Sequence, residues 1–402
     1  MTVEANRTAL VLTGGGARAA YQVGVLKALA ELLPDQKTSP FSILCGSSAG
    51  AINASVLACY ASRFNVGVRR LEYVWANLRS EQIYRADPWG MTVTSLKWLV
   101  SLFRPRRLQP SHRSLLDNTP LRDLLTRILR FNQIGSALER GHLFALSVTC
   151  SGYNSGESVS FYEGRPEIES WQRCHRGGTK ARIEIDHLMA SSAIPLLFPA
   201  VKINREFFGD GSVRFLAPIS PALHFGADRV MIIGVADTDG EDRRALESKD
   251  YPTIAEIAGQ VLDSVFIDSL NGDLERLQGV NRTLDKIPED LRSKLDLGLR
   301  PIETLVISPS QSLASMSSKH TKSLPPVVRF FFRRIGITRD TGSAVLSYLL
   351  CESSYTRELI ALGYTDAMNQ QKEIRRFFGV ATPAGTESSP PNEPLMKAPA
   401  QF

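Results

Sequence analysis

Two strand–turn–helix units occur within the first sixty residues, and they constrain the fold of this chain more than any other feature. The first has a short apolar strand at 8–13, a glycine turn at 14–16 and helical periodicity over 20–33. The second has an apolar strand at 41–45, which leads through a glycine-bounded turn into a helix-forming stretch at 49–60. Repeated units of this kind are typical of α/β proteins with parallel sheets. We therefore expect an α/β domain with a mainly parallel central sheet.

The rest of the 402-residue chain divides into parts that differ in pattern. Further strand candidates lie at 143–149, 158–162, 206–208, 229–235 and 304–308, and a short helix is expected at 187–192. Beyond about residue 250 the pattern is largely helical, at 254–277, 344–350 and 353–378. The last stretch is rich in proline, serine, threonine and glycine, which favours disorder. We expect an α/β domain at 8–240, a helical extension at 250–380 and a disordered tail at 381–402.

The second turn, Gly46-Ser47-Ser48-Ala49-Gly50, has the pattern of an exposed nucleophilic serine. Such a serine stands on a sharp turn between a strand and a helix, where glycine is needed at the flanking positions. The helix that follows would point its N-terminal amides toward a developing negative charge. The alternative is that the two glycines merely flank an ordinary helix N-cap. The position between a predicted strand and a predicted helix favours Ser48 as a nucleophile.

The first turn, Gly14-Gly15-Gly16-Ala17-Arg18, has two functional interpretations. It could hold a phosphate, as a dinucleotide-binding loop does, but Ala19 stands at the third glycine position and no P-loop lysine follows. Alternatively, the amides of Gly15 and Gly16 could form an oxyanion hole, with Arg18 reinforcing the negative charge or locking the loop. A tight turn alone explains one or two glycines better than three.

An activated serine also needs a base, and two candidates stand out. His224 would complete a Ser48, Asp210, His224 order, although in folds with that order the serine follows several strands rather than the second. Asp210 is flanked by Gly209 and Gly211 at the end of an apolar strand, and glycines let a carboxylate approach another backbone closely. An ionised aspartate could accept the serine proton directly. The alternative for this motif is an Asp-Gly hairpin turn.

With the glycine turn, the serine elbow and Asp210-Gly211 in this order, residues 8–223 resemble the patatin-like phospholipases. The stretch Ala190-Ser191-Ser192-Ala193-Ile194-Pro195 ahead of the aspartate is also similar to that family. Two positions depart from the family pattern, because Ala19 replaces a glycine and Ser212 follows Asp-Gly. Both residues are small, so we expect the backbone path to be kept.

The resemblance implies a three-layer α/β/α fold and a Ser–Asp dyad without histidine. Ser48 would be the nucleophile and Asp210 the base, supported by Gly46, Gly50 and Gly211. The oxyanion region would comprise Gly14, Gly15, Gly16 and Arg18. The implied activity is hydrolysis of fatty-acyl esters of phospholipids or lysophospholipids through an acyl-enzyme. Two alternatives are an esterase for a non-phospholipid acyl ester or storage polyester, and a lipid-binding protein without turnover.

Charge patterning suggests a second property, contact with an anionic membrane. The net charge is +6, and two segments without acids, 96–107 and 327–334, combine aromatic and aliphatic residues with arginines. Such segments suit adsorption to an anionic bilayer. The alternative is that their apolar residues pack inward while the arginines are solvated.

Other classes of function find less support in the sequence. No cluster with metal-ligand spacing occurs, so we expect no metal and no cofactor, and we expect no nucleic-acid partner. The five cysteines are scattered, which fits reduced thiols better than a disulfide framework. No apolar run reaches eighteen residues, and the N-terminus lacks the pattern of a secretory signal. We expect a cytoplasmic protein that can lie peripherally on the inner membrane surface.

Overall fold

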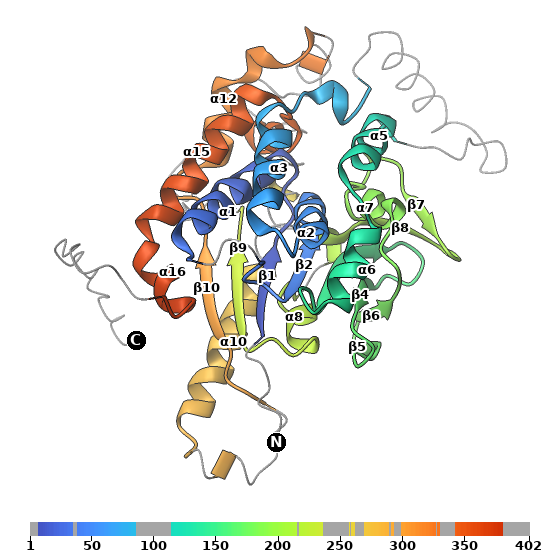
Figure 1. The fold of residues 1–402 in the computed structure, drawn as a ribbon. Coiled ribbons are helices and arrows are strands. Elements are labelled where there is room, and N and C mark those ends of the chain that lie inside the picture. Colours follow the sequence, from blue (N-terminus) through green and yellow to red (C-terminus); the bar gives the residue numbers. More distant parts are fainter. Residues whose placement is uncertain are drawn as a thin grey trace, which may run out of the picture.

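The central feature of the molecule is a single sheet with a parallel half and a largely antiparallel half (Figure 1). The computed structural model describes residues 7–34, 38–85, 114–214, 217–235, 257, 259–261, 269–288, 291–292, 299–326, 328–329 and 342–380. Within these residues, the strands are β1 (Thr8–Leu12), β2 (Ile43–Ser47), β3 (Ala145–Gly152), β4 (Ser158–Gly164), β5 (Trp171–Arg173), β6 (Arg176–Lys180), β7 (Val201–Ile203), β8 (Glu206–Asp210), β9 (Arg229–Ile233) and β10 (Glu303–Ile307).

The strand order is β10-β9-β1-β2-β3-β4-β6-β5, and the five strands from β10 to β3 are all parallel. Strand β4 runs antiparallel to β3, and the β7–β8 hairpin joins the sheet through an antiparallel pairing of β8 with β3. The carboxyl ends of β1 and β2 therefore lie side by side at one edge of the sheet. In open α/β sheets this edge is where functional sites form.

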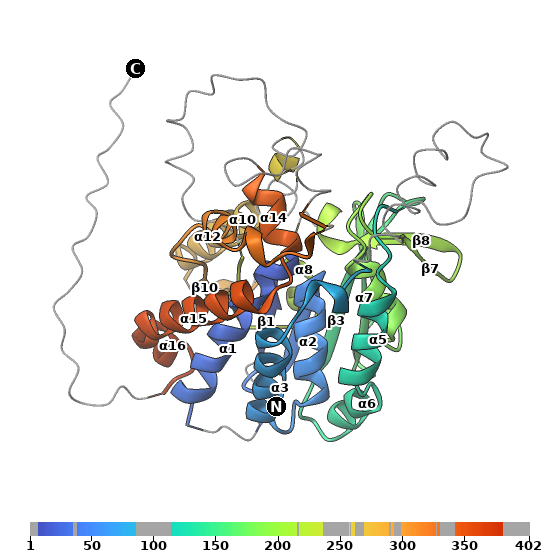
Figure 2. The ribbon, with the colours of Figure 1, turned by 90° about the horizontal axis from the view of Figure 1, so that it is seen from above.

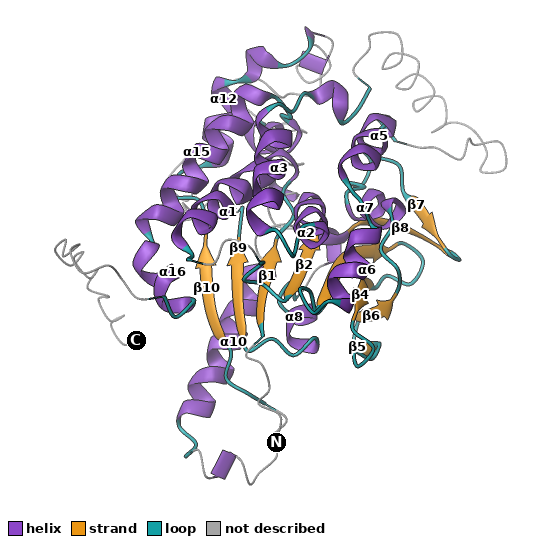
Figure 3. Cartoon of the chain, viewed as in Figure 1, coloured by secondary structure: helices purple, strands orange, loops and turns teal. Residues whose placement is uncertain are grey.

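Helices cover both faces of the sheet, as Figures 2 and 3 show. The longer helices are α1 (Ala20–Leu32), α2 (Ala49–Cys59), α3 (Phe64–Ala76), α5 (Thr119–Ile128), α6 (Asn132–Glu139), α10 (Ser269–Asp285) and α15 (Ser353–Asn369). The shorter ones are α7 (Ile185–Ser191), α8 (Ser220–His224), α12 (Leu313–Lys319), α14 (Ser343–Leu349) and α16 (Gln371–Phe377). Helices α1, α2, α3 and α15 lie on one face, and α8 and α10 lie on the other. The fold is thus the expected α/β/α arrangement of three layers.

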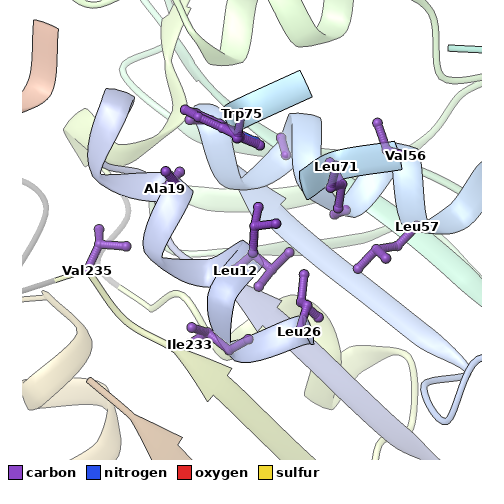
Figure 4. Packing of buried hydrophobic residues seen from close by; sticks show 14 of the residues in the cluster. Leu12, Ala19, Leu26, Val56, Leu57, Leu71, Trp75, Ile233 and Val235 are labelled. Atoms are coloured by element: carbon purple, nitrogen blue, oxygen red, sulfur yellow. The ribbon is translucent and has the colours of Figure 1, made fainter. Parts of the chain in front are cut away.

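The alternation of side chains along the buried strands explains the three layers. In β1, Leu10 and Leu12 pack into the cluster under α1 and α2, whereas Ala9 and Val11 pack into the cluster under α8 and α10. Successive residues of a strand point to opposite faces, so a strand covered on both sides is apolar throughout. Figure 4 shows the first cluster, in which Leu12 and Leu26 lie near Ile233.

The segment expected to be a helical extension contributes to this same architecture. Strand β10 adds to the sheet beside β9, and α15 packs along α1 in the larger core cluster. A Cβ atom on Gly24 would overlap the backbone of α15, and one on Gly363 would overlap the backbone of α1. The two glycines therefore permit a close helix crossing, and the boundary expected near residues 240–250 does not separate two independent cores.

Several boundaries differ from those expected. The strand predicted at 41–45 begins at Ile43 and runs to Ser47, because its register pairs Ile43 with Ala9 of β1. Phe41 instead packs against the ring of Phe64. Helices α3, α5 and α6 and the β5–β6 hairpin were not predicted, although Leu121, Leu125 and Ile128 show helical spacing in α5. The segment 96–107 and the predicted tail 381–402 lie outside the described residues, as does 327–334 apart from residues 328 and 329.

Candidate active site

Ser48 stands at the sharp turn between β2 and α2. Its backbone has φ 51° and ψ −131°, a region that non-glycine residues seldom adopt and that is often strained at functional sites. A Cβ atom on Gly46 would lie 2.6 Å from the Cα of Ala51, and one on Gly50 would overlap the carbonyl oxygen of Leu12. The two glycines are therefore required by the close packing of this turn against its own helix and against β1.

The carboxylate of Asp210 lies next to Ser48. The Ser48 hydroxyl donates a hydrogen bond of 2.6 Å to Oδ2 of Asp210, and both residues are buried. The sheet brings them together in two steps, because Ser47 pairs with Thr149 of β3 and Cys150 of β3 pairs with Asp210 of β8. After Asp210 the chain needs Gly211, since a Cβ there would overlap the carbonyl of Thr149.

The burial of Asp210 sets its acidity. Desolvation raises the pKa of this carboxyl from 3.8 to about 6, while hydrogen bonds from Ser48 and Ser212 lower the pKa and offset part of the effect. The backbone N–H of Ser212 donates to Oδ1 at 2.9 Å. No ion pair joins Asp210 to a described lysine or arginine. A carboxyl with a pKa of about 6 is mostly ionised at neutral pH and can still take up a proton, as a general base must.

Ser191 holds the backbone of the serine turn. Its hydroxyl accepts a 2.9 Å hydrogen bond from the Ser48 N–H and donates a 2.6 Å hydrogen bond to the carbonyl of Thr149. The segment that follows α7 also orients Asp210, whose N–H donates to the carbonyl of Ala193. Sequence analysis noted this stretch only as part of a resemblance and gave Ser191 no role. Nothing in the residue types or the spacing of the stretch 190–195 indicates that Ser191 contacts Ser48.

The glycine turn that follows β1 lies beside Ser48. The N–H of Gly14 donates to the hydroxyl of Ser47 at 3.1 Å, which ties the two turns together. Gly16 has φ 54°, and a Cβ on it would overlap the carbonyl oxygen of Tyr348 in α14. Gly16 and Ser48 line the same pocket. Gly15 packs against Val235, where a side chain would collide with the valine methyl group.

The side chain of Arg18 extends from this turn to α14. Its Nε donates to the hydroxyl of Ser347 at 2.7 Å, and Nη1 donates to the hydroxyl of Tyr348 at 3.2 Å. The guanidinium also stacks over the ring of Tyr348, 4.1 Å from its centre. Of the two functions considered for Arg18, these contacts match the locking of the loop, because the fully buried side chain fixes the turn to the C-terminal part of the chain.

The pocket beside Ser48 is almost entirely apolar and encloses about 60 Å³. Its walls include residues of α2, α3, α5 and α14 and of the segment after α7. They include Ile52, Trp75, Leu121, Ile194, Phe198 and Leu349. Such a lining suits a hydrocarbon chain that is attached to a reacting group at Ser48.

His224, the other candidate base, lies elsewhere. It ends α8 on the opposite face of the sheet from α2, and its ring stacks on Trp171 at 4.6 Å. No hydrogen bond between described residues links His224 to Ser48 or Asp210. The structure therefore brings Ser48 and Asp210 together without this histidine.

The described residues contain no group of three or more histidine, cysteine, aspartate or glutamate side chains that could hold a metal ion. In the same part of the chain, no helix is both long and apolar enough to cross a bilayer.

Comparison with known proteins places this site in a wider context. A family model described as "Patatin-like phospholipase" matches residues 10–223, more than half of the chain. The cGAMP-activated phospholipase of Pseudomonas aeruginosa (strain BWHPSA011 / Pa011) is 27% identical over 220 residues, which are 54% of this chain and 55% of that protein. The chain thus matches this curated relative over only about half of the relative's length.

Two solved structures are similar at low identity. VipD from Legionella pneumophila has 13% identity and a TM-score of 0.34, over 92% of this chain and 67% of that chain. Human GIVD cytosolic phospholipase A2 has 12% identity and a TM-score of 0.44, over 93% of this chain and 60% of that chain.

Proposed function

The chain belongs to the patatin-like phospholipase family, and from this premise we propose that it hydrolyses fatty-acyl ester bonds of phospholipids or lysophospholipids. One observation carries the proposal: the Ser48 hydroxyl donates to a buried aspartate at 2.6 Å, at the mouth of an apolar pocket. A serine paired with a base beside a hydrocarbon-lined cavity has the parts that acyl transfer from a lipid requires.

In the proposed reaction, Oγ of Ser48 attacks the ester carbonyl while its proton passes to Asp210. The resulting tetrahedral oxyanion is stabilised by backbone amides of the Gly15-Gly16 turn and by the N-terminal end of α2. Asp210 then gives the proton to the departing alcohol, which leaves an acyl group on Ser48. A water molecule, deprotonated by Asp210, attacks this acyl-enzyme, and the fatty acid is released with Ser48 restored.

The pocket is proposed to hold the part of the acyl chain next to the ester. Its volume of about 60 Å³ is well below the ~300 Å³ at the lower end of common ligand sites, so a long chain does not fit within it in this conformation. We therefore expect short acyl esters to be turned over without a lipid aggregate, and long chains to extend beyond the pocket.

A lipid surface is proposed to meet the rim of this pocket. Ile194 and Phe198 line the pocket, while Leu196 between them is 69% exposed and has φ 69°, an unusual conformation for a leucine. Phe207, on the strand that carries Asp210, is 47% exposed, and the basic residues Lys202 and Arg205 of the same hairpin are exposed too. An apolar rim with flanking cations suits an anionic bilayer. Contact with the inner surface of a membrane by an otherwise cytoplasmic protein thus remains part of the proposal.

A fluorophosphonate probe tests the central claim, because it labels only an activated serine. We expect labelling of the unmodified protein, none of Ser48→Ala, and release of fatty acid from phosphatidylglycerol by the unmodified protein alone. Absence of labelling would instead favour a lipid-binding protein without turnover. Labelling together with hydrolysis of simple esters but not of phospholipids would favour an esterase for another acyl ester or a storage polyester.

A further inference from the structure

A second cavity lies on the opposite face of the sheet from the pocket at Ser48. It encloses about 830 Å³ between α8, α10, the β5–β6 hairpin and the segment that enters β10. Helices α8 and α10, which line this cavity, pack on one face of the sheet, whereas α2 and α3, which line the pocket at Ser48, pack on the other (Figure 2). We refer to this cavity as the arginine groove.

The arginine groove has a strongly one-sided charge. Among the described residues that line it, five are arginines and one, Asp273, carries a carboxylate. The arginines come from the β5–β6 hairpin, from α10 and from positions between α10 and β10: Arg173, Arg176, Arg276, Arg292 and Arg300. A cleft lined by one sign of charge concentrates ions of the opposite sign.

The carboxylates of the neighbourhood offset only part of this charge. Asp273 is 3.9 Å from Arg276 and also accepts the backbone N–H of Ile219. Arg300 is 3.6 Å from Asp228 and donates to the carbonyl of Ala227 at 3.0 Å. Both ion pairs are long and the arginine of each is exposed to solvent, so each pair contributes little.

The two arginines of the β5–β6 hairpin have no such partner. Neither Arg173 nor Arg176 forms an ion pair with any residue that the structure describes. The Nε atom of Arg176 is buried and, within the same part of the chain, has no hydrogen-bond acceptor. A buried donor of this kind is costly unless an acceptor reaches it.

The field of these arginines also acts on His224. Burial, together with the charges of Arg173 and Arg176, lowers the pKa of this imidazole to about 4. The ring is therefore neutral at neutral pH, and it stacks flat on Trp171. Together with the side chains of Leu223, Leu277 and Val280, it gives the arginine groove an uncharged wall beside its cations.

We propose that the arginine groove binds a soluble phosphate ester that carries a partly apolar body. Guanidinium groups bind phosphate oxygens in pairs, and the leucine, valine and imidazole surfaces would receive the attached group. Because the arginine groove lies on the other face of the sheet and shares no lining residue with the pocket at Ser48, it is separate from the site for ester hydrolysis. The proposal does not depend on the proposed function.

Calorimetric titration of the purified protein with adenosine monophosphate, glycerol 3-phosphate and adenosine tests this. We expect adenosine monophosphate to bind most tightly, glycerol 3-phosphate more weakly and adenosine not at all. Raising the salt concentration from 50 to 300 mM should weaken binding of both phosphate compounds, because salt screens the attraction between the arginines and the phosphate. Arg173→Gln/Arg176→Gln should weaken binding at least tenfold. The control, Arg69→Gln/Arg70→Gln, removes the same charge from exposed positions of α3 and should leave binding unchanged.

Three results would overturn the proposal. The first is no binding of either phosphate compound at millimolar concentration in 50 mM salt. The second is equal binding by the groove variant and its control. The third is binding only to phosphatidylglycerol vesicles, lost in the groove variant, which would make the groove a membrane contact. If the double variant unfolds, Arg276→Gln replaces it, because that side chain is 67% exposed and can be removed without loss of the core. All titrations are repeated in Ser48→Ala, so that their outcome is independent of turnover.

Discussion

The hydroxyl of Ser48 lies 2.6 Å from a carboxylate oxygen of Asp210, although 162 positions separate the two residues in the chain. Both are buried, and the contact depends on two strand pairings, β2 with β3 and β3 with β8. The Ser48 N–H donates to the hydroxyl of Ser191, and the Ser212 N–H donates to the carboxylate of Asp210, so both members of the pair are held in place. The predictions below follow from this contact and from the packing around it.

Removing either member of the pair should abolish hydrolysis. We expect Ser48→Ala and Asp210→Asn each to lower kcat for p-nitrophenyl butyrate by about 10³-fold or more, because neither nucleophile nor base can then act. Circular dichroism should show that both variants stay folded. His224→Ala serves as the control, since its ring stacks on Trp171 and no hydrogen bond between described residues joins it to Ser48. Turnover that survives in Asp210→Asn and is lost in His224→Ala would contradict the Ser–Asp pair.

The pH dependence of the rate should report the acidity of Asp210. Burial raises the pKa of this carboxyl to about 6, and only the ionised form accepts the serine proton. We therefore expect kcat/KM for a soluble ester to rise about tenfold per pH unit below pH 6 and to level off above it. Initial rates between pH 4.5 and 8 measure the profile. A rate that stays level over this whole range would contradict the assignment of Asp210 as the base.

The same acidity predicts an effect on stability with a definite sign. Because the pKa of Asp210 is 3.8 in the unfolded chain and about 6 in the native state, the native state binds more protons between these values. Stability from this group is therefore greatest below pH 4 and is lost as the pH rises through 6, by about 3 kcal/mol in all. Asp210→Asn cannot titrate, so its stability relative to the unmodified protein should increase between pH 4.5 and 7.5. Urea unfolding at both pH values measures this, and an unchanged difference would rule out the raised pKa.

The close approach of the two turns predicts a steric effect at Gly50. A Cβ there would overlap the carbonyl of Leu12, so we expect Gly50→Ala to lower the free energy of unfolding by about 3 kcal/mol or more. Gly135→Ala is the matched control, because Gly135 lies in α6 with no atom within 4 Å of its added methyl group. Alanine there should stabilise the protein by up to about 1 kcal/mol. Urea denaturation measures the free energy of unfolding of both variants. Equal changes in the two variants would contradict the predicted steric effect at Gly50.

The apolar rim of the pocket predicts a separation between lipid binding and chemistry. Leu196→Asp should reduce sedimentation with phosphatidylglycerol vesicles severalfold while leaving hydrolysis of a soluble short-chain ester unchanged. Aspartate tolerates positive φ better than leucine, so the fold should be kept. Val66→Asp introduces the same charge at an exposed position near the start of α3, whereas Trp75 near the other end of this helix lines the pocket, and it should have no effect. Equal sedimentation of the two variants would argue against the rim as the lipid contact.

The elements nearest to Ser48 could be predicted from sequence because they are local. The strand–turn–helix units, Gly46 and Gly50, and the Asp-Gly turn at 210 each follow from patterns only a few residues long. The two candidate bases could not be separated in this way. His224 and Asp210 are both plausible by residue type, and only the placement of α8 and β8 on different sides of the molecule distinguishes them.

What the sequence alone determined is therefore the α/β class, the two turns and the residue types that could react. The tertiary structure decided which of them meet, since it pairs β8 with β3, hydrogen-bonds Ser191 to the Ser48 backbone and locks Arg18 onto α14. It also decided that the chain after residue 250 joins the same core through β10 and α15. The physical reason is that turns and periodicity are set by neighbours in the chain. Strand pairing and burial, which also fix the acidity of Asp210, depend on residues far apart in sequence.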